Sequence, residues 1–211
     1  MRTEAPRSSS PLEYTRSGEP STGPRVTTVG VVSDTHLPRF GTALPRALEE
    51  GLRTAGVTRI VHGGDHVDGL AVEALERIAP VDAVAGNNDG PELVRRFGRS
   101  KILTIEGVRI GLVHGDLGAG ASTPERARRS FAPGTVDIVC FGHSHQPLVA
   151  SYDGILLVNP GSPTDKRRES RYSYALLRLG DGPPRAEIVR YDDRRPGPTA
   201  RRVTSHSRDA S

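Results

Sequence analysis

Short apolar runs alternate with amphipathic segments along the first half of the chain. The runs are rich in Val and Ile, which is typical of buried strands. The segments between them place apolar residues at helical spacing and end near a glycine or a proline, which would stop a helix. The predicted strands are 26–33, 59–62 and 81–85, and the predicted helices are 44–55, 70–78 and 92–97. This alternation favours a partly parallel sheet with helices packed on it.

The second half of the chain is richer in predicted strands. The dipeptides Glu106-Gly107 and Asp153-Gly154 each separate two apolar runs, which is the signal of a β-hairpin. The predicted strands are 101–105, 108–113, 136–141, 148–152, 155–158, 172–179 and 186–191, with one helix at 124–131. Two sheets packed face to face, with helices outside, would accommodate both halves. We therefore expect one α/β domain over residues 26–191.

The segments before and after this domain, residues 1–25 and 192–211, are poor in apolar residues and rich in Pro, Ser and Arg. We expect both to be solvated, disordered tails. They carry most of the formal charge of +4, because their arginines outnumber their acidic residues by one and by two, respectively. A nucleic-acid-binding domain would gather Lys and Arg on one folded face. A nucleic-acid partner is therefore not expected.

Other features of the composition narrow the setting of the protein. No apolar stretch approaches the ~20 residues needed to span a bilayer, and residues 1–25 lack the apolar region of a secretory signal. The one cysteine, Cys140, cannot form an internal disulfide and lies in an apolar run, where a buried thiol is expected. These features predict a cytoplasmic protein with no membrane partner. The sequence leaves the oligomeric state open, and a homo-oligomer is one alternative.

Five short stretches rich in Asp, Asn and His follow five of the predicted strands. They span residues 33–36, 63–66, 86–89, 114–116 and 142–145. Each has a simpler explanation on its own, such as a carboxylate beside a surface histidine, a helix N-cap or a turn. Because all five stand where a strand ends, we expect them to meet and form a metal site.

Two of the stretches place potential ligands two residues apart, at Asp34 and His36 and at His143 and His145. Residues i and i+2 of an extended chain point to the same side. We therefore expect each pair to lie on extended backbone and to face the site together. The whole set mixes imidazole with carboxylate and amide oxygen and contains no thiolate. Such ligands suit Mn, Fe, Ni or Zn better than Ca or Mg.

The motifs follow the order Asp-x-His, Gly-Asp, Gly-Asn-x-Asp, His-Gly and Gly-His-x-His. This order resembles the calcineurin-like metallophosphoesterases, and the stretch Asn159-Pro160-Gly161-Ser162 resembles their small YfcE-like bacterial and archaeal subgroup. The resemblance covers about residues 26–191. It implies a four-layer α/β/β/α sandwich of two mixed sheets flanked by helices. It also implies hydrolysis of a small-molecule phosphoester, with phosphodiesters favoured over monoesters.

The resemblance also assigns metal ligands by position. The first of two divalent ions would be held by Asp34, His36 and His145, the second by Asn87, His114 and His143, and Asp65 would bridge them. Mn is the expected metal, with Fe, Ni and Zn as alternatives. A water bridging two ions about 4 Å apart would lose its proton near neutral pH and attack phosphorus as hydroxide. Both ions would withdraw charge from the phosphoryl oxygens during this attack.

Three residues near the ligands are candidates for other roles. Many members of the larger family have a histidine where this chain has Asn88, and that histidine protonates the leaving group, which an amide cannot do. His66 is our candidate for a replacement proton donor, with a surface histidine as the equally weighted alternative. Asp89 is expected to orient a neighbouring ligand or water.

Two further alternatives concern the function as a whole and one loop. A retromer subunit of the same fold works as a non-catalytic scaffold and has lost parts of its metal site. Every ligand position in this chain is filled by a competent residue, which favours an enzyme over a scaffold. The basic run Lys166-Arg167-Arg168 follows the Asn-Pro-Gly-Ser stretch. A solvated loop is the favoured interpretation of this run, and contact with a substrate phosphate is the alternative.

Overall fold

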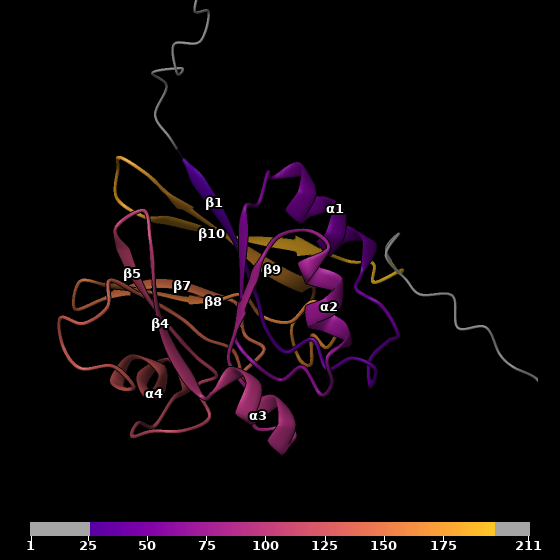
Figure 1. The fold of residues 1–211 in the computed structure, drawn as a ribbon, viewed down its shortest axis with the longest axis horizontal. Coiled ribbons are helices and arrows are strands. Elements are labelled where there is room, and N and C mark those ends of the chain that lie inside the picture. Colours follow the sequence, from indigo (N-terminus) through magenta and orange to yellow (C-terminus); the bar gives the residue numbers. More distant parts are fainter. Residues whose placement is uncertain (1–25, 197–211) are drawn as a thin grey trace, which may run out of the picture.

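The computed structural model describes residues 26–196, which form two five-stranded sheets stacked on each other (Figure 1). The first sheet has the order β10-β9-β1-β2-β3, and the second has the order β4-β5-β6-β8-β7. The strands of the first sheet are β1 (Thr27–Val32), β2 (Arg59–His62), β3 (Val81–Ala83), β9 (Tyr172–Leu179) and β10 (Arg185–Tyr191). Those of the second are β4 (Ser100–Ile105), β5 (Val108–Val113), β6 (Ile138–Cys140), β7 (Leu148–Tyr152) and β8 (Ile155–Asn159).

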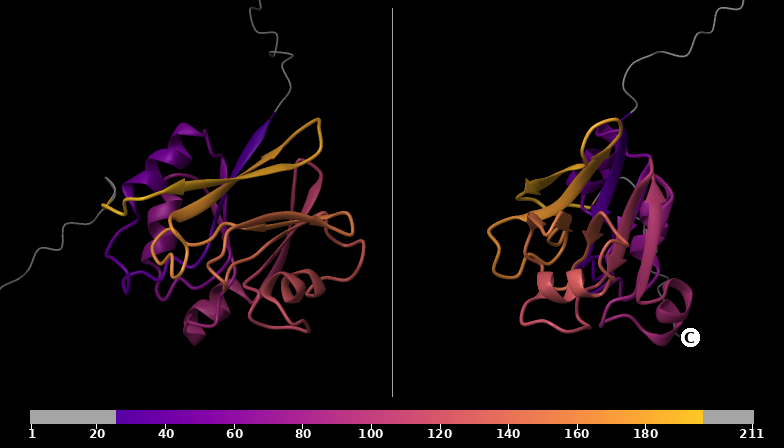
Figure 2. Two further views of the ribbon diagram at one scale, coloured as in Figure 1. Left: turned by 180° about the vertical axis from the view of Figure 1, so that it is seen from behind. Right: turned by 90° about the vertical axis from the view of Figure 1, so that its left-hand side faces the viewer.

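Both sheets are mixed, as the resemblance implied. In the first, β1, β2 and β3 are parallel, while β9 and β10 are antiparallel neighbours. In the second, β5, β6 and β8 are parallel, and β4 and β7 are antiparallel edge strands. The helices are α1 (Arg46–Thr54), α2 (Leu70–Glu76), α3 (Pro91–Phe97) and α4 (Thr123–Arg129). Figure 2 shows α1 and α2 beside the first sheet and α4 beside the second, so the expected α/β sandwich is confirmed.

Three hydrophobic clusters fill the interfaces between the four layers. The cluster between the sheets includes Val29, Val31, Ile110, Ile138 and Leu177. The cluster under α1 and α2 includes Val32, Leu48, Leu52 and Leu75, and the cluster under α4 includes Ala127, Val139 and Phe141. Successive residues of one strand alternate between clusters, because side chains of a strand point to opposite faces. Strands buried on both faces in this way appear in the sequence as continuous apolar runs.

A late strand of the described residues pairs with the first one. Strand β9 pairs with β1 in an antiparallel register that joins Thr27 to Leu179 and Val31 to Ala175. The described chain also continues past the predicted domain boundary at residue 191, because Arg194 donates hydrogen bonds to the carbonyls of Phe40 and Thr164, each at 2.9 Å. The rest of the two predicted tails, 1–25 and 197–211, lies outside the described residues. Within residues 26–196, no helix has the length and apolar character needed to cross a bilayer.

The thiol of Cys140 lies in the cluster between the sheets and is 0% exposed, as the sequence predicted. Burial raises the pKa of this thiol to about 12. We therefore expect native protein to resist DTNB, which reacts with thiolates, and denatured protein to release one equivalent of thionitrobenzoate per chain. Rapid labelling of the native protein would contradict a sealed interface between the sheets.

Candidate metal centre

The five ligand stretches lie at the carboxyl ends of β1, β2, β3, β5 and β6, where loops of the two sheets meet. The backbone N–H of His143, after β6, donates to Asp34 Oδ2, after β1, at 3.0 Å. The ring Nδ1 of His114, after β5, donates to the carbonyl of Gly63, after β2, at 2.8 Å. These contacts between the sheets bring all seven predicted ligands into one cluster.

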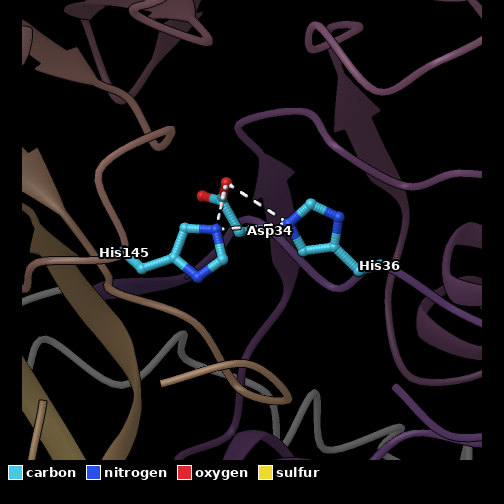
Figure 3. A group of neighbouring side chains, drawn as sticks. All are labelled: Asp34, His36 and His145. Atoms are coloured by element: carbon cyan, nitrogen blue, oxygen red, sulfur yellow. Dashed lines mark hydrogen bonds and ion pairs between the residues drawn. The ribbon is translucent and has the colours of Figure 1, made fainter. Parts of the chain in front are cut away.

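Asp34, His36 and His145 point toward a common centre (Figure 3). The Nε2 atoms of His36 and His145 lie 3.2 Å apart, and they lie 3.9 and 3.2 Å from Asp34 Oδ1. All three residues are at most 2% exposed. Asp34 Oδ1 has no hydrogen-bond partner among the described residues. A buried carboxylate oxygen without a donor, beside two imidazole nitrogens, is a donor set suited to a divalent transition metal.

A second group adjoins the first through Asp65. Asp65 Oδ2 lies 3.7 Å from His36 Nε2 and 3.3 Å from His114 Nε2, so this one carboxylate oxygen faces both groups. Asn87 Oδ1 then lies 3.1 Å from His114 Nε2 and 3.0 Å from His143 Nδ1. The arrangement fits the ligand sets that the resemblance implied for two ions, with Asp65 between them. Asp34, Asp65 and His114 also come close enough to one another to share an ion.

The backbone at the ligands corrects one expectation. We expected the pairs two residues apart to lie on extended backbone, but five ligands have positive φ: Asp34 (55°), His36 (45°), Asp65 (59°), His143 (67°) and His145 (60°). This left-handed conformation is uncommon for residues other than glycine. Cross-loop hydrogen bonds hold it, including those from Asp34 N to Gly64 O (2.9 Å) and from His36 N to Asp65 O (3.0 Å). The side chains therefore converge through strained turns, which are typical of functional sites.

Hydrogen bonds behind two of the histidines fix which nitrogen faces the centre. The Nδ1 of His114 donates to the carbonyl of Gly63, and the Nδ1 of His145 donates to the carbonyl of Asp165. Each ring therefore turns its Nε2 toward Asp65 or Asp34, and this nitrogen can bind a metal ion once it is deprotonated. Metal-binding histidines in proteins are oriented in the same way.

The pKa values of the cluster reflect strong interactions between its buried carboxylates and the imidazoles beside them. Burial alone would lower the pKa of His114, but the carboxylates of Asp65 and Asp34 outweigh it and raise this pKa to about 9. Burial alone would raise the pKa of Asp65 and of Asp34, but the imidazoles beside them, His114 for Asp65 and His145 and His114 for Asp34, lower both pKa values. Two buried carboxylates side by side need a cationic partner. A divalent cation would meet that need.

Asp89 lies behind the ligands. Its carboxylate accepts hydrogen bonds from the backbone N–H groups of Asp65 (3.0 Å), Val67 (2.7 Å) and Gly86 (2.7 Å). These bonds tie the loop after β2 to the loop after β3, so Asp89 is placed to orient Asp65 and Asn87 rather than to contact a substrate.

His66 and Asn88 differ from what the sequence suggested. His66 is not a surface histidine, because it is 0% exposed and its Nε2 donates to the carbonyl of Val84 at 3.0 Å. Asn88 donates its backbone N–H to Asp65 Oδ1 (2.8 Å) and its side-chain amide to Asp65 Oδ2 (2.6 Å). Asn88, which lacks a transferable proton, therefore positions the Asp65 carboxylate that both groups share.

The sequence motifs do not include one supporting residue, His62. The side chain of His62, fully buried at the end of β2, accepts the backbone N–H of Gly64 through Nδ1 and donates to Thr35 Oγ1 through Nε2, each at 3.2 Å. It thus connects the loop that carries Asp65 with the loop that carries Asp34 and His36. The sequence does place His62 in a predicted buried strand. A buried polar side chain requires hydrogen-bond partners, and this requirement could have pointed to the supporting role of His62.

Known proteins from two organisms are similar to this chain in sequence. A probable metallophosphoesterase from Methanothermobacter thermautotrophicus is 35% identical over 166 residues, which cover 77% of this chain and 91% of that protein. A phosphodiesterase from Methanocaldococcus jannaschii is 29% identical over 147 residues, covering 63% of this chain and 82% of that protein.

A solved structure extends the likeness to the fold. Vacuolar Protein Sorting 29 from Cryptosporidium parvum matches with a TM-score of 0.62 at 23% identity, covering 80% of this chain and 99% of that chain. Residues 28–182 match the calcineurin-like phosphoesterase superfamily domain. With this match spanning most of the described chain, the protein belongs to the calcineurin-like phosphoesterase superfamily.

Proposed function

We propose that this protein hydrolyses phosphodiesters with the help of two divalent metal ions, of which Mn is the expected one. The observation that carries the proposal is the position of Asp65, whose Oδ2 faces His36 at 3.7 Å and His114 at 3.3 Å. The similarity to a phosphodiesterase supports diesters as the substrate class. When bound, the two ions would supply an activated water and positive charge for the phosphoryl oxygens.

The residues of the chain divide into a buried floor and an open rim. Asp34, His36, Asp65 and His114 are buried, whereas Asn87 and Asn88 are exposed and His143 is partly exposed. The carboxylates therefore lie out of bulk solvent, which strengthens their electrostatic interactions. A substrate would approach the centre from its exposed side, where Asn87 and His143 lie.

Protonation of the leaving group is the weak point of this site. Asn88 has no proton to transfer. His66 is sealed by Val84 and by the rings of His62 and Phe97, and burial lowers its pKa. We infer that His66 is structural and that the enzyme favours leaving groups that depart without an acid, such as phenolates.

Replacement of Asn88 by histidine tests this inference. We expect Asn88→His to raise kcat/KM for alkyl diesters by about 10²-fold relative to aryl diesters, because a positioned general acid contributes at least that factor, whereas loss of the Asn88 amide bond to Asp65 affects both esters alike. Aryl diesters, whose leaving groups need no proton, should gain much less. The measurement is kcat/KM for matched alkyl and aryl esters of one phosphate. An equal effect on both would show that protonation does not limit the alkyl esters.

The metal requirement tests the proposed function itself. Protein stripped with a chelator should not hydrolyse bis(p-nitrophenyl) phosphate, and Mn²⁺ should restore the activity at two ions per chain. His143→Ala should lower kcat/KM by about 100-fold, because a lost ligand weakens the metal site. Arg178→Ala is a suitable control, since Arg178 is an exposed residue of β9 paired with Glu187. Activity that is unaffected by both the chelator and the His143→Ala substitution would overturn the proposal.

A scaffold protein is the second candidate. Its support is the structural similarity to Vacuolar Protein Sorting 29. A scaffold needs neither a shared carboxylate nor an open rim of ligands, so a protein that binds metal but cleaves no phosphoester would favour it.

A further inference from the structure

A cavity of about 340 Å³ lies beside the turn that carries His145. One wall is the turn 144–146, which includes His145 itself, and the other wall is the loop 166–169. The volume falls within the range of small-molecule sites, roughly 300–1,000 Å³. Of the seven proposed ligands only His145 lines this cavity, so the cavity lies next to the turn that carries His143 and His145.

The loop that forms the second wall has a defined shape. Arg167 has a φ of 48°, and its backbone N–H donates to Asp165 Oδ1 at 3.3 Å. The N–H of Glu169 donates to the carbonyl of Lys166 at 2.8 Å. The loop is also attached to the metal centre, because the Nδ1 of His145 donates to the carbonyl of Asp165. Arg167 Nη1 lies 3.4 Å from the carbonyl of His143.

The cavity carries an excess of positive charge. Its walls contain Lys166, Arg167 and Arg168 against the single carboxylate of Glu169. Lys166 donates to a neutral carbonyl, that of Ser170, and Arg167 Nε lies 3.8 Å from Asp165 Oδ2. Among residues 26–196, no acidic side chain forms an ion pair with Arg168. Even after one cation is assigned to Asp165, the cavity stays cationic.

A second cavity, beside His114 of the metal centre, differs in charge. It has a volume of about 240 Å³ and lies beside His114. Its arginine, Arg99, is occupied by Asp116 and by the carbonyl of Gly86. The two cavities are therefore unequal, and an anionic group would be drawn to the one beside His145.

We propose that the cavity beside His145 binds a second phosphate group of the substrate. The substrate class would be a phosphodiester that also carries a phosphate monoester, with its scissile phosphate at the metal centre. Arg167 and Arg168 would act as specificity residues, because the guanidinium fork matches phosphate oxygens in pairs. The inference rests on the proposed phosphodiesterase function.

Two substrates that differ by one phosphate test the proposal. They are the p-nitrophenyl ester of thymidine 5′-phosphate and the same ester with an added 3′-phosphate, assayed with Mn²⁺. We expect kcat/KM to be about tenfold or more higher for the phosphorylated ester, mainly through a lower KM, since charge-assisted hydrogen bonds contribute at least this much. A ratio near one in the unmodified protein would overturn the proposal.

Variants identify the residues responsible. The double variant Arg167→Gln with Arg168→Gln should bring the ratio of kcat/KM for the two esters close to one, and Arg168→Lys should retain part of the preference. Arg178→Gln, on the exposed surface of β9, should keep the full ratio. A ratio preserved in the double variant would exclude these arginines.

A binding measurement separates this proposal from the proposed function. Calorimetry should show tighter binding of thymidine 3′,5′-bisphosphate than of thymidine 5′-phosphate, and the double variant should lose the difference. If neither ester is cleaved but this difference is found, the phosphodiesterase function fails and the phosphate site stands. If both esters are cleaved equally and both nucleotides bind equally, the phosphate site fails and the function stands.

Discussion

Asp65→Asn should abolish most of the activity while leaving the fold in place. The asparagine keeps the size of the side chain but removes the charge from the oxygen that lies 3.3 Å from His114 Nε2 and 3.7 Å from His36 Nε2. A neutral amide cannot hold two cations as a shared carboxylate can. Metal ions stabilise such transition states by several kcal/mol, so we expect kcat/KM to fall by at least about 10³-fold. Metal content measured by mass spectrometry should drop below two ions per chain.

The matched control is Asp68→Asn, three residues further along the same loop. Asp68 Oδ1 accepts the backbone N–H of Leu70 at 2.8 Å at the start of α2 and takes no part in the ligand cluster. This variant should keep both ions and nearly full activity. If Asp65→Asn retained two ions and activity within tenfold of the unmodified protein, the shared position of Asp65 would be disproved.

Gly86→Ala should have the second largest effect. A Cβ at Gly86 would lie 2.1 Å from Asp65 Oδ1 and 2.5 Å from the backbone nitrogen of Asp65. Neither distance is tolerable, so the loop after β2 must move away from the loop after β3. A displacement of about 1 Å at a catalytic group costs on the order of 100-fold. We therefore expect kcat/KM to fall by at least this factor, together with a lower Tm.

Gly90→Ala is the matched control for Gly86→Ala. A Cβ at Gly90 would meet no atom within 4 Å, and its φ of −68° suits alanine. Its activity and Tm should match those of the unmodified protein. Equal losses in Gly86→Ala and Gly90→Ala would mean that backbone flexibility, rather than the position of Asp65, explains the effect.

The secondary structure followed from local pattern. The predicted strands and helices all appear, with boundaries that differ by a few residues, as in the strand predicted at 136–141 and found as β6 (Ile138–Cys140). Apolar runs and turn residues are local signals, so they carry this information. The pairing of β9 with β1 joins residues at opposite ends of the domain. Such pairing depends on how the layers pack, which no local pattern records.

The ligand types and their order along the chain were also readable from the sequence, because each stretch follows an apolar run and has metal-binding side chains. The tertiary structure decided how they meet. Asp34 and His145 are far apart along the chain, but Asp34 Oδ1 lies only 3.2 Å from His145 Nε2. The two residues meet through left-handed turns rather than extended strands. The burial of His66 and the hydrogen bond from the Asn88 amide to Asp65 likewise depend on neighbours from other loops. Sequence spacing determines the chemistry that each loop offers, whereas the packing of two sheets determines which loops share it.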